Sequence, residues 1–197
     1  HVSPLNSRLK IQSFILTEIQ NYNQDLPSGI TLKGNNLVDK ELNDDLYRAG
    51  QAGVNIRIIV RGMCTLIPGV AELSENITII SIVDRFLEHP RVMLFENAGD
   101  KRVFISSADW MTRNMDGRIE VGAPIYSQRL IEQIDTTLNL QFQDTLKARI
   151  IDQEQSNQYV KRGNRRHLRS QMAIYEYLKQ VEKQAILDNQ TQDAESE

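Results

Sequence analysis

The sequence predicts an α/β protein, with a mixed β-sheet flanked by helices and a helical appendage at the C-terminal end. Three observations predict this class. The nearly continuous apolar runs at 55–60 and 77–83 are typical of strands covered on both faces. A strand at 30–32, a helix and the strand at 55–60 follow one another, as in a parallel crossover unit. Two short apolar runs, 92–95 and 103–105, flank a turn cluster and indicate a hairpin.

Capping residues and apolar periodicity define the first two helices. Asn6 or Ser7 can cap a helix that runs to about residue 22. Asp39 can cap a second helix, which closes at Gly50 or Gly53. Each of these caps precedes an apolar repeat of helical spacing, so each helix has a predicted start.

The rest of the chain alternates between sheet and helix. Residues 85–88 are expected to form a short turn of helix before the hairpin, and 118–125 to complete the sheet. Residues 127–146 carry apolar side chains at threes and fours, which predicts an amphipathic helix packed on the sheet. A polar, basic segment then leads to a last helix, marked by apolar residues between Met172 and Val181.

One domain is expected over residues 1–183, because a chain of this length can bury a core of its own. Its core covers 1–146, and the basic segment and last helix cover 147–183. Residues 184–197 are acidic and poor in apolar side chains, which predicts a disordered tail. The chain begins at His1 without a methionine, which indicates an excised domain or a processed fragment.

Composition excludes several classes of protein. No apolar run approaches the roughly 20 residues needed to span a bilayer, and no signal pattern opens the chain, so a cytoplasmic protein is expected. The single cysteine, Cys64, excludes an internal disulfide and a cysteine-rich zinc site. The net charge of −3 hides an uneven distribution, because residues 161–169 hold five basic side chains and no acid.

Polar side chains gather at the ends of the hairpin strands. His89 precedes the first strand, whereas Ser106, Ser107 and Asp109 follow the second. Because hairpin strands run antiparallel, these groups are expected to converge at one edge of the sheet. Arg61 lies just past the end of a buried strand, where open α/β sheets usually bind ligands.

These side chains suit phosphate chemistry. An unperturbed imidazole titrates near pH ~6.5, so His89 can act as a nucleophile, transfer a proton or bind a phosphate oxygen. Arg61 offers a planar fork of donors that fits a phosphate. Ser106, Ser107 and Asp109 can orient His89 or hydrogen-bond a phosphoryl oxygen. Lys33, Arg113 and Arg118 can line a phosphate channel.

Each of these residues also has a purely structural interpretation. His89 can merely cap the short helix before it, and Arg61 can be a surface arginine. The serines and Asp109 can simply begin the turn before Trp110, and both interpretations of that element stay open. For His89, the nearby Arg91 and the Ser-Asp element favour the functional interpretation.

The order of these residues resembles one half of the phospholipase D superfamily site, which reads His-x-Lys followed by Gly-Ser-x-Asn. Here His89-x-Arg91 precedes Ser-Ser-x-Asp109. Arg91 stands where lysine is usual, and Asp109 stands where asparagine is usual. These departures argue against an ordinary phospholipase or nuclease. The resemblance implies a phospholipase D-like fold for the predicted mixed sheet and its flanking helices.

Longer stretches resemble the second phospholipase D-like C-terminal domain of bacterial polyphosphate kinase. The resemblance runs from about Ser3 to about Leu178, with its motifs in the right order. These motifs are IVRGMC at 59–64, SEN at 74–76, SIVDRFLEH at 81–89, ISSADWMTRN at 105–114 and RIEV at 118–121. This resemblance implies that the chain is one catalytic half of an ATP:polyphosphate phosphotransferase. Such an enzyme reversibly transfers the terminal phosphate of ATP to polyphosphate through a phosphohistidine, which the preceding domain holds.

The resemblance also implies roles for single residues. Arg61 and His89 match family positions that contact the phosphates of bound ATP, and His89 is the catalytic residue expected to assist transfer. The residues expected to support them are Arg91, Ser107, Asp109 and Arg113. Neither His1 nor His167 matches the family's nucleophilic histidine, so the isolated domain is expected to be inactive.

Cofactors and partners follow from the same resemblance. ATP is the expected substrate, and Mg²⁺ is expected for the full enzyme with ligands outside this chain, so that no metal site is expected within it. The expected partners are ATP or ADP, inorganic polyphosphate and the remaining domains of the same enzyme, in a homo-oligomer when full length, and no nucleic acid. Peripheral attachment to the inner membrane is an alternative within the cytoplasmic location. The basic cluster at 161–169 stays open between polyphosphate, nucleic acid and an acidic partner.

Two other functions stay open. The chain can be a non-catalytic phosphate- or polyanion-binding module that uses Arg61, His89 and the basic segment. It can also be a phospholipase D-like phosphodiesterase that pairs two copies of His89 across a homodimer. Arg91 and Asp109 count against the phosphodiesterase.

Overall fold

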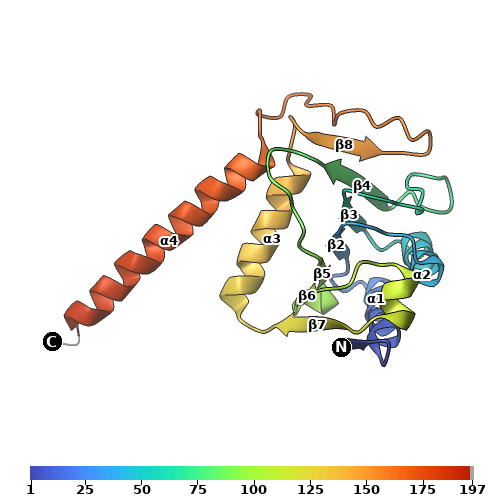
Figure 1. Ribbon diagram of the computed structural model, residues 1–197, viewed down its shortest axis with the longest axis horizontal. Helices are drawn as coiled ribbons and strands as arrows, with labels where there is room; N and C mark the ends of the chain where they lie inside the picture. Colours follow the sequence, from blue (N-terminus) through green and yellow to red (C-terminus); the bar gives the residue numbers. More distant parts are fainter. Residues whose placement is uncertain (196–197) are drawn as a thin grey trace.

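A mixed sheet of eight strands organises the computed structural model, which describes residues 1–195. The strands lie in the order β1-β7-β6-β5-β2-β3-β4-β8 (Figure 1). Their bounds are Val2–Ser3 for β1, Ile30–Gly34 for β2, Ile56–Val60 for β3, Ile77–Ile82 for β4, Val92–Phe95 for β5, Arg102–Ser106 for β6, Glu120–Ile125 for β7 and Ala148–Ile151 for β8. The predicted α/β class with a mixed sheet is confirmed.

Helices cover both faces of this sheet. The helices α1, Ser7–Asn23, and α2, Lys40–Gln51, lie on one face, and α3, Gln128–Phe142, lies on the other (Figure 1). Each face has an apolar core, with Leu46 buried in the first and Leu138 buried in the second. The sheet is therefore the middle layer of three.

The predicted strand after the first crossover is confirmed as a strand with two buried faces. In β3, Ile58 belongs to the core under α1 and α2, and its neighbour Ile59 belongs to the core under α3. Successive side chains of a strand point to opposite faces, so consecutive apolar residues are needed where both faces are covered. This explains why the run lacks the alternation of a strand with one wet face.

Strand direction brings several chain ends to one edge of the sheet. The strands β2, β3 and β4 are parallel, whereas β5 runs antiparallel to both β2 and β6. The C-terminal ends of the parallel strands therefore lie beside the start of β5 and the end of β6. The residues at this edge are Gly34, Val60, Ile82, Val92 and Ser106. The predicted convergence of the hairpin ends at one sheet edge is confirmed.

Asp39 caps α2 as predicted. Its Oδ1 accepts a hydrogen bond from the backbone N–H of Leu42 at 3.1 Å. Arg8 of α1 also donates to both of its oxygens, at 2.7 and 2.9 Å, and continues to Asp116 at 2.7 Å. The cap therefore also ties α1, α2 and the segment before β7 together.

The segment boundaries after β4 differ from the predictions. Residues 85–86 form a bend, and 87–88 have no regular structure, instead of the expected turn of helix. The helix expected over 127–146 ends at Phe142, because Asp144 accepts hydrogen bonds from the backbone N–H groups of the residues that follow it. The strand β8 then pairs with β4, so the sheet extends past the core expected to close at residue 146.

The last helix is longer than predicted. The helix α4, Ser170–Glu195, continues through the acidic stretch expected to be a disordered tail from residue 184, and 196–197 lie outside the described residues. The stretch contains no Gly or Pro to end a helix, which permits the continuation. In Figure 1 the helix points away from the sheet along most of its length. No helix of the described part is long and apolar enough to cross a membrane.

Candidate functional site

A chain of hydrogen bonds crosses the sheet edge at the ends of β2, β3 and β5. Arg61, which follows β3, donates from Nε to Oδ1 of Asn35 at 2.7 Å. The backbone N–H of Asn35, which follows β2, donates to Oδ1 of Asp109 at 2.8 Å. Arg91 then donates to both oxygens of Asp109, at 3.2 and 3.3 Å. Three strand ends and the loop after β6 are thus joined by side chains.

The same chain of contacts reaches the histidine. The Nη1 of Arg91 lies 3.1 Å from Nδ1 of His89, and its Nη2 lies 3.3 Å from Nε2 of the same ring. A guanidinium can only donate, so a ring nitrogen that bonds to it must be an acceptor. The two contacts are therefore alternatives for the neutral ring, which retains one N–H for another partner.

Asp109 is the buried anion of this network. It is 7% exposed and also accepts hydrogen bonds from the side-chain amides of Asn35 and Asn36, at 3.2 Å each. Burial alone would raise the pKa of Asp109, but hydrogen bonds from Arg91 and from the backbone of Asn35 outweigh burial and lower it. Asp109 is thus held as a carboxylate that fixes Arg91.

Two groups at this edge are available to a ligand. The terminal nitrogens of Arg61 have no hydrogen-bond or ion-pair partner among residues 1–195, and only its Nε is engaged. His89 is exposed. A planar guanidinium with two free terminal nitrogens and an imidazole on the same sheet edge form a surface that suits phosphate oxygens.

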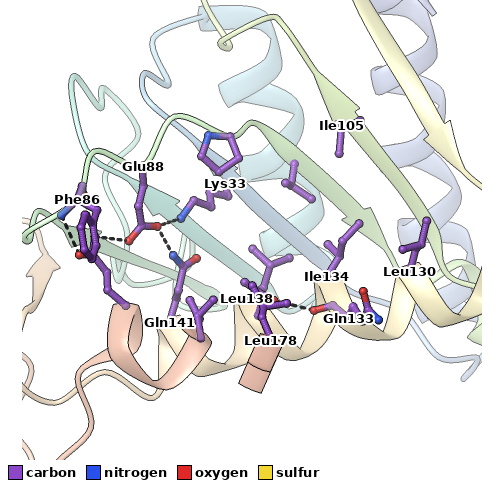
Figure 2. Close-up of a pocket in the computed structure, with 15 residues that line it drawn as sticks. Lys33, Phe86, Glu88, Ile105, Leu130, Gln133, Ile134, Leu138, Gln141 and Leu178 are labelled. Carbon is purple, nitrogen blue, oxygen red and sulfur yellow. Dashed lines mark hydrogen bonds and ion pairs between the residues drawn. The ribbon is translucent and has the colours of Figure 1, made fainter. Parts of the chain in front are cut away.

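Glu88 holds the segment that carries His89 on the side of α3. Its carboxylate accepts from Lys33 of β2 and from Gln141 of α3 (Figure 2). It also accepts from Gln171 of α4, at 2.8 Å. Lys33 is 9% exposed, and burial lowers its pKa while Glu88 opposes that shift. These polar groups close one end of a largely apolar cavity of about 490 Å³ between the sheet, α3 and α4.

Not every residue predicted for the site joins this network. Ser107 donates to Glu120 and accepts from the backbone N–H of Val121 at 3.1 Å, so it fastens β7 instead of orienting His89. Arg113 is exposed on a short π-helical turn, Arg113–Gly117, outside the network. The expected direct contact between Asp109 and His89 is replaced by a contact through Arg91.

The predictions also missed residues that the structure brings into the site. Asn35 directly follows the end of β2, as Arg61 directly follows the end of β3. The rule that open α/β sheets bind ligands at the carboxyl ends of their strands could therefore have found it. Glu88 and Gln171 carried no such signal, because their contact joins two segments more than eighty residues apart. The charged residues of the basic cluster between Lys161 and Arg166 are exposed. Arg162 and Arg165 donate to backbone carbonyls of the same loop.

The layered sheet, with His-x-Arg before β5 and Ser-Ser-x-Asp beginning at the last residue of β6, has a phospholipase D-like fold. Two solved structures of low identity share the fold. The phospholipase D family member Nuc from Salmonella typhimurium superposes with a TM-score of 0.56 at 15% identity, over 77% of this chain and 95% of that one. NucT from Helicobacter pylori gives 0.53 at 13%, over 71% and 91%.

Within that class, the chain belongs to the family described as polyphosphate kinase C-terminal domain 2, whose model matches residues 1–171. The chain is 62% identical over 183 residues to polyphosphate kinase of Vibrio cholerae and 57% identical over 181 residues to that of Escherichia coli K12. It covers 26% of each of these relatives, and they cover 93% and 92% of it. The crystal structure of polyphosphate kinase from Porphyromonas gingivalis matches with a TM-score of 0.91 at 41% identity, over 93% of this chain and 28% of that one. The chain thus spans about a quarter of the curated relatives it matches, and the predicted family is confirmed.

Proposed function

We propose that this domain supplies one half of a phosphoryl-transfer site. In the complete protein, the terminal phosphate of ATP would pass reversibly to polyphosphate through a phosphohistidine held by another domain. The observation that supports this most directly is the continuous network from Arg61 to His89, which leaves the terminal nitrogens of Arg61 and one ring nitrogen of His89 available at one sheet edge. Family membership supports the choice of substrates, because the relatives are named polyphosphate kinase.

Arg61 binds and neutralises phosphate oxygens in this proposal. Phosphoryl transfer depends mainly on positioning and on stabilising charge that spreads over the phosphoryl oxygens. Its Nε bond to Asn35 fixes the plane of the guanidinium, and the two terminal nitrogens are left to make a bidentate contact. A donor that is already oriented needs no rearrangement when the charge develops.

His89 assists the transfer from the same edge. Arg91 orients its ring, and Asp109 in turn orients Arg91 through two hydrogen bonds. The remaining ring nitrogen can donate to a phosphoryl oxygen or exchange a proton with it. Asp109 and Arg91 therefore act as positioning residues in this proposal.

The phosphorylated histidine is proposed to lie outside this chain. His1 packs its ring against Phe104, with centroids 5.5 Å apart, and its Nδ1 contacts Oγ of Ser7 at 2.8 Å. His167 lies in the exposed basic loop. No group of three His, Cys, Asp or Glu side chains in the described part could hold a metal ion. We also propose that the ligands of Mg²⁺ lie in other domains.

The remaining expectations stay proposals of the same kind. The partners proposed are ATP or ADP, polyphosphate and the other domains of the protein, which would assemble as a homo-oligomer. The cytoplasmic location stays a prediction. The division of the chain at residues 146 and 183 is likewise a prediction about domain organisation.

The direct test replaces the two proposed ligand contacts in a polyphosphate kinase that contains this domain. His89→Ala and Arg61→Ala should each slow ATP-dependent polyphosphate synthesis by roughly 10²- to 10⁴-fold, as expected for a lost acid–base or charge-stabilising group. Arg129→Ala, at an exposed position of α3, is the matched control and should keep the normal rate. A His89→Ala enzyme with an unchanged rate would refute the assignment.

A further inference from the structure

The carboxylate of Glu88 joins three elements of the fold, β2, α3 and α4. Its donors are Lys33 from the sheet and Gln141 from α3 (Figure 2), together with Gln171 from α4. The last of these also accepts from the backbone N–H of Phe86 at 3.0 Å and donates to the carbonyl of Phe86 at 2.9 Å. The side chain of Gln171 thus makes three hydrogen bonds to the segment 86–88.

That segment has few other attachments. Residues 84–90 belong to no helix or strand and make no main-chain to main-chain hydrogen bond in the described part of the chain. Leu87 is 76% exposed, so apolar packing holds it weakly. Besides the contacts at 86–88, the segment is tied by ion pairs of Asp84 with Arg169, at 2.6 Å, and with Lys147, at 4.0 Å. Arg91 also contacts the ring and the backbone carbonyl of His89. Gln171 of α4 and Arg169, which directly precedes α4, therefore supply side-chain contacts where the neighbouring strands have a backbone ladder.

Glu88 and His89 face opposite ways from adjacent positions. The side chain of Glu88 reaches towards α3 and α4, whereas the ring of His89 contacts Arg91 at the sheet edge. Pro90 follows and restricts the backbone of His89 to extended conformations. Fixing Glu88 on one side therefore limits where the imidazole can lie on the other.

The pair of Lys33 and Glu88 is poorly hydrated. Their side chains are 8% and 17% exposed, and Gln141 is 1% exposed. Among the residues that the structure describes, each has the other as its sole ion-pair partner. Removing one member of such a pair leaves an uncompensated buried charge, whereas removing both charges together is often tolerated.

We propose that Glu88 is a positioning residue for phosphoryl transfer. Through Lys33, Gln141 and Gln171 it holds the segment that delivers His89 to the phosphates, so α4 is part of the support of the site and not only an appendage. This inference rests on the function proposed above. It predicts that disturbing the pair lowers kcat while the KM for ATP changes little, because the free edges of Arg61 are untouched.

A double-mutant cycle that removes the two charges, in a polyphosphate kinase that contains this domain, tests the proposal. Glu88→Gln and Lys33→Met should each lower kcat by about 10- to 100-fold, the scale of a small misplacement of a reacting group. The double variant should recover most of that loss, because it leaves no buried charge without a partner. Lys40→Met, which breaks the exposed pair of Lys40 with Asp44, is the control and should be unchanged.

Gln171→Leu tests the same proposal if the charge variants do not fold. It removes all three contacts of α4 to residues 86–88 without leaving a buried charge, and a loss of kcat with a normal KM for ATP is expected. Normal kcat in Gln171→Leu and in both single charge variants, beside an inactive His89→Ala enzyme, would overturn this inference alone. An active His89→Ala enzyme would instead overturn the function on which it rests. A lower Tm with normal kcat in the variants would show that Glu88 has a structural role only, and would also overturn the inference about positioning.

Discussion

Arg91 and Asp109 form an ion pair that joins the start of β5 to the loop after β6, with Nε and Oδ1 3.2 Å apart. In the superfamily pattern that the chain resembles, these two positions are lysine and asparagine. Here they carry a fork of donors and a carboxylate, which fit one another bidentately. The two departures are thus one structural unit, and it turns the guanidinium towards His89.

Replacing Asp109 should show how much this unit contributes to stability. Asp109→Asn leaves Arg91 without its anion and weakens bonds to Asn35, so the free energy of unfolding should fall by about 1–3 kcal/mol. Urea denaturation of the chain measures the change. Asp44→Asn, at an exposed ion pair of α2, should change stability by less than about 1 kcal/mol. Equal effects of the two substitutions would contradict the role given to Asp109.

The contribution of Asp109 should depend on pH in a defined direction. Its pKa is lowered in the folded protein, so the stabilisation is present above the unfolded pKa of about 3.9 and is lost as pH falls through the folded value. The difference in unfolding free energy between the original chain and Asp109→Asn should therefore shrink steadily below about pH 4. A difference that stays constant down to acid pH would rule out this linkage.

The cap of α2 should be a second point of high sensitivity. Asp39 is 1% exposed and accepts from Leu42 and Arg8 together. Asp39→Ala should lower the free energy of unfolding by about 2 kcal/mol or more, because it removes a cap and one anion of a buried pair. Lys40→Ala, one position further on, should stay within about 0.5 kcal/mol. Thermal and urea unfolding of both variants would decide the comparison.

Arg61→Lys should distinguish a fork of donors from a simple positive charge. A lysine keeps the charge but loses both the bidentate edge and the Nε contact with Asn35. In a polyphosphate kinase that contains this domain, the rate should fall by roughly 10- to 100-fold, less than for Arg61→Ala. Steady-state kinetics with ATP measure it, and a lysine enzyme with the original rate would show that charge alone suffices.

The layers, most strands and the positions of Arg61 and His89 could be predicted because they depend on local signals. Buried strands such as β3 appear as apolar runs, and Asp39 stands directly before an apolar repeat. The length of α4 could not be predicted from composition, because acidic residues lower the apolar content without breaking a helix. Contacts such as that of Gln171 with Glu88 depend on how distant segments pack, which no local pattern records.

The roles of single polar residues were harder to predict for a related reason. Ser107 stands in the expected motif, but its hydroxyl is engaged by Glu120 of the neighbouring strand. Lys33 looked like a cation available to a phosphate channel, and burial pairs it with Glu88 instead. In both cases the nearest partner in space, and not the position in the motif, sets the role.

The central claim is that this domain provides contacts to a nucleophile held elsewhere. It is tested most directly by measuring ATP-dependent polyphosphate synthesis by this chain alone, and then by the chain joined to the other domains of a polyphosphate kinase. The account predicts no synthesis by the chain alone and synthesis after joining, which His89→Ala abolishes. Synthesis by the chain alone would place the nucleophile within these 197 residues and would contradict the account.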